Sequence, residues 1–179
     1  MKIGRSALVL AATFGVSMFI AGGDAAAQQK YRVTQAPAST SQYVQQHALA
    51  VNDAPDHQIR VYEIHFEYPK NDFSFAGVLV KEAYVRGMSD YIGLSGPFTV
   101  YSVYTLEDGN KVYSRSTGTS MLTTDTDGKA VVKFSAVENY VGGTGRFKGI
   151  RGQVHNIGQR EVVAKTITQQ TSGEYWIEE

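Results

Sequence analysis

The chain has 179 residues, and its 17 Lys plus Arg balance its 17 Asp plus Glu, so the formal net charge is zero. A neutral chain has no net positive field to attract nucleic acid or an anionic membrane surface, which argues against both as partners. The chain contains no cysteine, and that excludes disulfides, thiol nucleophiles and cysteine-ligated metal. Eleven tyrosines and eight phenylalanines provide much aromatic surface that the fold must bury.

The N-terminal segment, residues 1–27, has the layout of a secretory signal. Lys2 and Arg5 precede an apolar run that ends at Ala21, and small residues follow up to Ala27. A membrane anchor is the alternative, but the apolar run is short for a span and its alanine-rich end is typical of a cleavage site. We therefore expect cleavage after Ala27 and a periplasmic or secreted protein that has no membrane span after signal removal.

The next segment, residues 28–57, is rich in Gln, Ser, Ala, Thr and Asp. This composition favours a flexible leader, with one helical turn around residues 41–50. Its two histidines, His47 and His57, are interpreted as solvated surface side chains.

From residue 58 to residue 179, short apolar runs alternate with turn signals, and no helical period is sustained. Asp108-Gly109 is a strong hairpin signal, and Asp127-Gly128 marks another turn. The extended runs cover residues 59–68, 75–87, 96–106, 111–122, 130–141, 142–157, 161–170 and 173–179. Short strands with a turn about every ten residues indicate an antiparallel sandwich or barrel. A ring of about eight strands is either filled by side chains or holds one small ligand.

A glycine-rich segment, YVGGTGRFKGIRGQV, covers residues 140–154. A phosphate-binding loop is one interpretation, but such a loop joins a strand to a helix, and neither a helix nor a Walker lysine follows. Glycines within strands mark bulges, sharp bends or close backbone approach. The structural interpretation is therefore favoured.

The same segment also resembles a known family. GGTGRFKGIRGQ is similar to the signature of the allene oxide cyclase and dirigent barrels, and Val61-Tyr62-Glu63-Ile64 is similar to an early strand of the cyclases. The aromatic last strand, GEYWI, adds to the likeness. The resemblance implies an all-β fold, a single closed antiparallel eight-stranded barrel of calycin type with an apolar cavity. It also implies a homo-oligomer, dimer or trimer, that uses no cofactor and no metal.

The family's chemistry suggests the class of ligand. Its plant cyclases close an unstable fatty-acid epoxide, and its dirigent members steer the coupling or rearrangement of phenolic intermediates. The resemblance therefore implies a small hydrophobic or phenolic molecule bound in the cavity.

The stretch VYEIHFEYP, residues 61–69, contains the candidate catalytic groups. Glu63, His65 and Glu67 lie on one face of this strand, opposite an aromatic face. The alternation alone favours a strand whose polar face is solvated. The resemblance instead implies that Glu63 points into the cavity, and strand parity then brings His65 inward and Glu67 to one mouth. The aromatic face would then need cover from an oligomer or from the leader.

Two positions depart from the cyclase pattern. This chain has His65 where the cyclases have an asparagine, and Ser120 lies near the position of a cavity tyrosine. If Glu63 and His65 share the cavity, they form a coupled acid–base pair suited to isomerisation, cyclisation or elimination without a cofactor. The alternatives are a non-catalytic barrel that binds or orients hydrophobic molecules, and a structural module whose interior is filled.

Other side chains are weaker candidates for substrate binding. Arg86 and Arg115 have the geometry to bind a carboxylate, although a lone strand arginine is usually a surface residue. Four further substrate-binding candidates join Glu67: Tyr84, Tyr101, Tyr104 and Ser120.

Three remaining features are interpreted as structural. Asp125 and Asp127 are assigned to a turn, since the other ligands of a calcium loop are missing. Arg151 is expected to brace a barrel corner, and His155 to lie on the surface.

Overall fold

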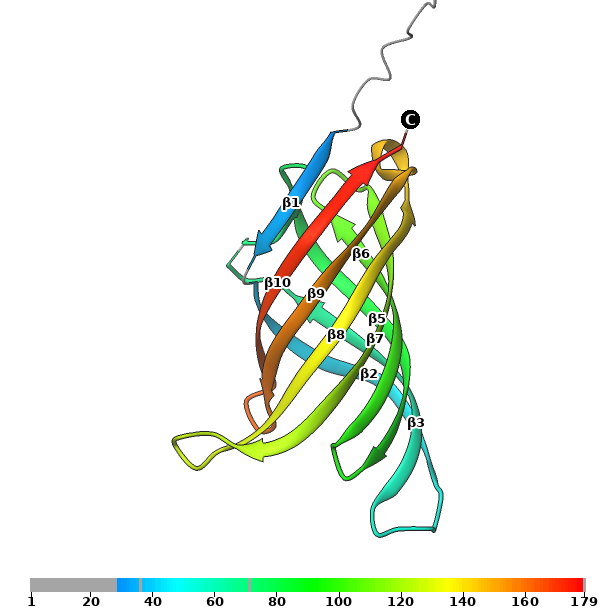
Figure 1. The fold of residues 1–179 in the computed structure, drawn as a ribbon, viewed down its shortest axis with the longest axis vertical. Coiled ribbons are helices and arrows are strands. Elements are labelled where there is room, and N and C mark those ends of the chain that lie inside the picture. The colour runs from blue at the N-terminus through cyan, green and yellow to red at the C-terminus, as the bar shows by residue number, and fades with distance from the viewer. Residues whose placement is uncertain (1–28, 36, 71, 179) are drawn as a thin grey trace, which may run out of the picture.

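The computed structural model describes residues 29–35, 37–70 and 72–178, which form an all-β fold (Figure 1). The predicted signal segment lies outside the described residues. The elements in chain order are β1 Lys30–Gln35, β2 Ala38–Ala50, β3 His57–Glu67, β4 Ser74–Phe75, β5 Val78–Ile92, β6 Gly96–Leu106, β7 Lys111–Thr124, β8 Ala130–Gly143, the short 3-10 helix η1 Gly145–Phe147, β9 Ile150–Glu161 and β10 Thr166–Ile177. Within this part of the chain, no helix has the length and apolarity to cross a membrane.

Eight of the ten strands form a ring. Neighbours pair antiparallel in the order β2-β3-β5-β6-β7-β8-β9-β10, and β10 pairs back with β2 between Thr166↔Thr40 and Thr168↔Ala38. The other two strands lie beside this ring, β1 on β10 and β4 on β5. The strands are long and strongly tilted, as Figure 1 shows. The predicted antiparallel all-β fold is confirmed.

The expected flexible leader is wrong for the part that the structure describes. Residues 30–35 and 38–50 form β1 and β2, so the helical turn expected around residues 41–50 does not form. β2 runs along β3 from Thr40↔Glu67 to Ala50↔Gln58. Without β2 the ring would have seven strands. The composition misled because the side chains from Val44 to Ala50 are exposed, so backbone pairing, rather than burial, holds this half of the strand.

An aromatic cluster fills the end of the ring at which β10 finishes. The ring of Phe75 lies 5.2–5.7 Å, between centroids, from those of Phe73, Tyr104, Tyr140 and Tyr175. Phe75 lies on the short strand β4, which places its side chain deep in the core. The cluster therefore occupies this end of the interior. The turns β2–β3, β5–β6, β7–β8 and β9–β10 lie at the opposite end of the ring, which is called the hairpin end below (Figure 1).

The glycine-rich segment is structural, as predicted. The register between β7 and β8 shifts between Tyr140 and Gly142, and Gly145, with φ +52°, begins η1, which buries Phe147. A Cβ on Gly143 would lie 2.4 Å from the carbonyl oxygen of Lys111, and one on Gly149 would lie 2.1 Å from that of Glu178. The glycines permit a bulge and close backbone contacts at this corner.

The turns predicted from Asp-Gly pairs are confirmed. Gly109 has a φ of +82°, and the Asp108 carboxylate accepts hydrogen bonds from the backbone and side chain of Asn110, which lower its pKa. In the next turn, Asp125 Oδ1 accepts backbone hydrogen bonds from Asp127 and Lys129. These carboxylates therefore act as turn residues.

We predict that Val33→Ala lowers the free energy of unfolding by about 2 kcal/mol, the cost of two buried methyl groups and the space they leave. Val33 lies on β1 and is 2% exposed within the core. Chemical denaturation measures the change. Val44→Ala is the matched control, since Val44 lies in the same segment but is 53% exposed. Equal stability of Val33→Ala and the native chain would contradict the packing of β1 in the core and favour a flexible leader.

Candidate ligand cavity

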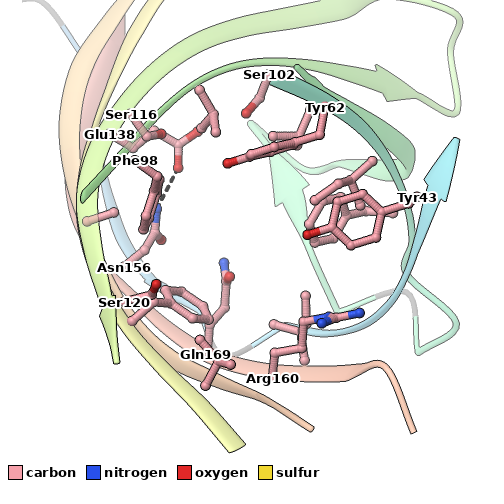
Figure 2. Close-up of a pocket in the computed structure, with 18 of the residues that line it drawn as sticks. Tyr43, Tyr62, Phe98, Ser102, Ser116, Ser120, Glu138, Asn156, Arg160 and Gln169 are labelled. Carbon is pink, nitrogen blue, oxygen red and sulfur yellow. Dashed lines mark hydrogen bonds between the residues drawn. The ribbon is translucent and has the colours of Figure 1, made fainter. Parts of the chain in front are cut away.

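A cavity of about 200 Å³ lies inside the ring, next to the aromatic cluster. Its wall is mainly aromatic and aliphatic. Figure 2 shows the labelled side chains pointing inward around an open centre. The polar members of the wall are Arg60, Ser102, Ser116, Ser120, Glu138, Asn156, Arg160 and Gln169.

Strand β3 turns its aromatic face to this cavity. Tyr62, Ile64 and Phe66 line it, so Glu63 and His65 lie on the outer face. The inward Glu63 that the family resemblance implied is therefore wrong, and the orientation that the alternation favoured is right. The polar face is only partly solvated, since the side chains of Glu63 and His65 are 15% and 23% exposed. Burying the aromatic face removes far more apolar area from water. Burying the acid and the histidine in its place would cost their desolvation.

Each expected catalytic group pairs with strand β5 on the outside of the ring. Glu63 Oε2 forms an ion pair with Arg86 Nε at 2.7 Å, and the glutamate side chain is 15% exposed. His65 Nε2 lies 2.8 Å from Glu82 Oε2, and its ring stacks on Tyr84 at 4.6 Å between centroids. The pair therefore does not form an acid–base unit facing a ligand.

The predicted substrate-binding residues divide between the two faces. Tyr104 and Ser120 line the cavity. Glu67 is exposed at the end of β3. The others lie on the outer face, where cationic side chains lie over tyrosine rings: Arg86 over Tyr84 at 5.8 Å, and Arg115 over Tyr101 at 6.0 Å.

The cavity contains a buried polar network that the sequence analysis missed. Glu138 is 4% exposed, and it accepts hydrogen bonds of 2.7 Å from the Tyr104 hydroxyl and 2.7 Å from Asn156 Nδ2. The Thr171 hydroxyl donates to Asn156 Oδ1 at 2.6 Å, which fixes the amide orientation. Figure 2 shows the contact between Glu138 and Asn156 as a dashed line. Both donors to the carboxylate are neutral, and no cation pairs with it among the described residues.

The tyrosines around this network are held neutral. Burial raises the pKa of Tyr68, Tyr104 and Tyr140, and the nearby carboxylate of Glu138 raises each of them further. Tyr104 therefore keeps its hydroxyl proton throughout the physiological pH range and donates a hydrogen bond to Glu138. The network presents a carboxylate held by fixed donors at the cavity wall.

Two arginines lie at the other end of the cavity, close to the hairpins. Arg60 lies near the start of β3 and its guanidinium lies 5.1 Å from the ring centroid of Tyr91. Arg160 lies near the end of β9, 5.8 Å from the ring centroid of Tyr43, and its Nε donates to Ser41 Oγ at 3.2 Å. In Figure 2, Arg160 and Tyr43 lie across the open centre from Glu138.

The alternation of side chains along a strand could have identified two of the missed residues, Glu138 and Arg60. Glu138 shares the face of Phe134, Ala136 and Tyr140, an apolar row in which an acid stands out. Arg60 precedes the inward residues of β3 by the same period of two. A charged residue in phase with an apolar row is the pattern to search for.

The comparisons with known proteins add no assignment. No protein family, curated protein or solved structure matches this chain. Among residues 29–35, 37–70 and 72–178, no group of three His, Asp or Glu side chains is placed to hold a metal ion.

Of the histidines, His57 departs most from its prediction. It was expected to be solvated, but its ring lies between two carboxylates: Nδ1 contacts Asp53, and Nε2 lies 2.6 Å from Asp90 Oδ1. These hydrogen bonds, with Asp90 the larger influence, raise the pKa of His57. His155 is exposed, as expected, and Arg151 donates to the carbonyl oxygens of Val141 and Ile150 at the glycine-rich corner.

We predict that His57 titrates above its ordinary pKa of about 6.5, measured by NMR of the imidazole. Because the folded-state pKa is raised, its stabilising contribution is complete below the unfolded pKa and is lost as pH rises through the folded one. Asp90→Asn should bring the titration back toward the ordinary value. Asp127→Asn, a turn residue elsewhere, should leave it unchanged. A His57 pKa at or below 6.5 in the native chain would contradict the arrangement.

Proposed function

We propose that this protein binds one small hydrophobic or aromatic molecule in the cavity of its strand ring. The observation that carries the proposal is the cavity of about 200 Å³ with a mainly apolar wall. A buried apolar cavity of about 150 Å³ is enough to admit benzene, so this one suits a single ring or a short chain. The seryl hydroxyls and Gln169 on the wall give such a ligand polar contacts that set its orientation.

The finer features expected from the sequence belong to the same proposal. They are a closed barrel of the allene oxide cyclase and dirigent type, export through the signal segment, and assembly into a homo-oligomer. The eight-strand ring and the glycine-rich corner support the first of these. Exposed apolar side chains on the outer face of neighbouring strands, among them Val61 and Met88, support the last.

We predict that Ala136→Phe abolishes binding of a neutral probe such as 4-ethylphenol, because Ala136 lines the cavity and the larger ring would occupy it. Isothermal titration calorimetry measures the affinity, and thermal melting verifies folding. Ile157→Phe is the matched control, because Ile157 is exposed on the same pair of strands, β8 and β9. Binding that survives Ala136→Phe in a folded protein would place the ligand elsewhere.

A second function, cofactor-independent proton transfer, is favoured by Glu138. It is the one acid on the cavity wall among the described residues, and both of its observed partners are neutral donors. A carboxylate keeps further lone pairs to accept a proton from a bound ligand. A base positioned in this way contributes about 10²–10⁴-fold to a proton-transfer step, as isomerisation or elimination requires.

The two functions are separated by hydrogen exchange. The ligand retained by protein purified from its host, identified by native mass spectrometry, is incubated with the protein in deuterated water. If Glu138 acts as a base, the native chain catalyses the replacement of a C–H hydrogen of the ligand by deuterium, whereas Glu138→Gln binds the ligand without this exchange. Glu63→Gln, on the outer face, is the matched control and should behave as native. If the native chain retains the ligand but catalyses no exchange, the protein binds the ligand without catalysing proton transfer.

A further inference from the structure

The charged groups of the cavity wall are separated along its length. They are Arg60, Arg160 and Glu138 among the described residues, two positive and one negative, for a net charge of +1. Arg160 follows Asn156, the partner of Glu138, by four residues on β9, which corresponds to about 13 Å along a strand. The cavity therefore has a cationic end near the hairpins and an anionic group beside the aromatic cluster.

Neither arginine has an anionic partner in the part of the chain that the structure describes. Other arginines do, since Arg86 pairs with Glu63 and Arg151 with Glu178. Arg60 Nε is buried without a hydrogen-bond acceptor, and Arg160 Nε contacts only the neutral hydroxyl of Ser41. A guanidinium has five N–H donors, and leaving buried donors unsatisfied costs free energy. Arg60 Nε therefore lacks an acceptor, and neither guanidinium group has an anionic one, which a ligand can supply.

The tyrosines position both guanidinium groups. Arg60 lies over Tyr91 and Arg160 over Tyr43, while Tyr43 and Tyr62 meet edge to face at 5.9 Å. The face of a tyrosine ring attracts a cation without neutralising its charge. The stacking orients the arginines and, apart from Arg160 Nε, leaves their N–H donors for an anion.

We propose, building on the function proposed above, that the ligand is an amphipathic carboxylate. Its carboxylate head binds Arg60 and Arg160, and its apolar body extends along the cavity toward the aromatic cluster. The planar guanidinium matches a carboxylate through paired N–H donors. Glu138 would repel the ligand's carboxylate at the end beside the aromatic cluster, so the head binds at the hairpin end.

The test compares octanoate with 1-octanol, two probes of equal chain length that differ in the charge of the head, by isothermal titration calorimetry. The native chain should bind octanoate about tenfold tighter or more, the gain expected of a charge-assisted hydrogen bond. The double variant Arg60→Gln/Arg160→Gln should lose this preference and keep its affinity for octanol. Arg86→Gln/Arg115→Gln, on the outer face, is the matched control and should keep the preference.

A third probe tests the native chain alone, in case the double variant does not fold. Octylammonium should bind more weakly than octanoate, since the two arginines outnumber Glu138 on the cavity wall; equal or tighter binding overturns the proposal. Equal binding of octanoate and octanol also overturns it, while loss of both in Ala136→Phe keeps the cavity as a hydrophobic site. If the native chain binds none of the three probes, this proposal is overturned; binding unaffected by Ala136→Phe overturns the cavity function as well.

Discussion

The choice of which face of β3 points inward determines the rest of the structure. Successive side chains alternate between faces, so burying Tyr62, Ile64 and Phe66 puts Glu63 and His65 outside. Residues opposite each other in a sheet share a face, and the ladder carries this choice from strand to strand around the ring. A one-residue slip would bring a different set of side chains to the cavity.

Charged side chains on the outer and inner faces of the ring have different partners. On the outer face of β3 and β5, acids and bases pair across strands, as Glu63 does with Arg86 and His65 with Glu82. On the inner face, Glu138 is bound by neutral donors and Arg60 has a buried Nε without an acceptor. Paired charges on a surface need nothing further, whereas unpaired charges in a cavity are costly unless something binds there. This contrast is the strongest physical reason to place the function inside.

The sequence predicted the bounds of the strands better than it predicted which side chains point inward and which strands pair. The bounds of β6, Gly96–Leu106, agree with the expected run, because Asp108-Gly109 and flanking alternation are local signals. β2 was missed because its half from Val44 to Ala50 is exposed and shows no regular alternation of apolar and polar residues, and no Asp-Gly pair marks the turn at residues 51–56 that leads to β3. Glu63 was misplaced because a short motif likeness overrode the stronger local evidence of alternation. Glu138 was detectable, but its partner Asn156 lies on another strand, and sequence alone does not establish that register.

The same geometry relates the two proposals made for the cavity. The cluster around Phe75 closes one end of the interior, so a ligand held by its head at Arg60 and Arg160 presents its far end to Glu138. A ligand about 13 Å long in the strand direction then meets the base at its tail and not beside its carboxylate. Any proton removed by Glu138 would come from a carbon remote from the acid group. Such a carbon is acidic only when another group of the ligand activates it, and this narrows the chemistry to ligands with a second functional group at the far end.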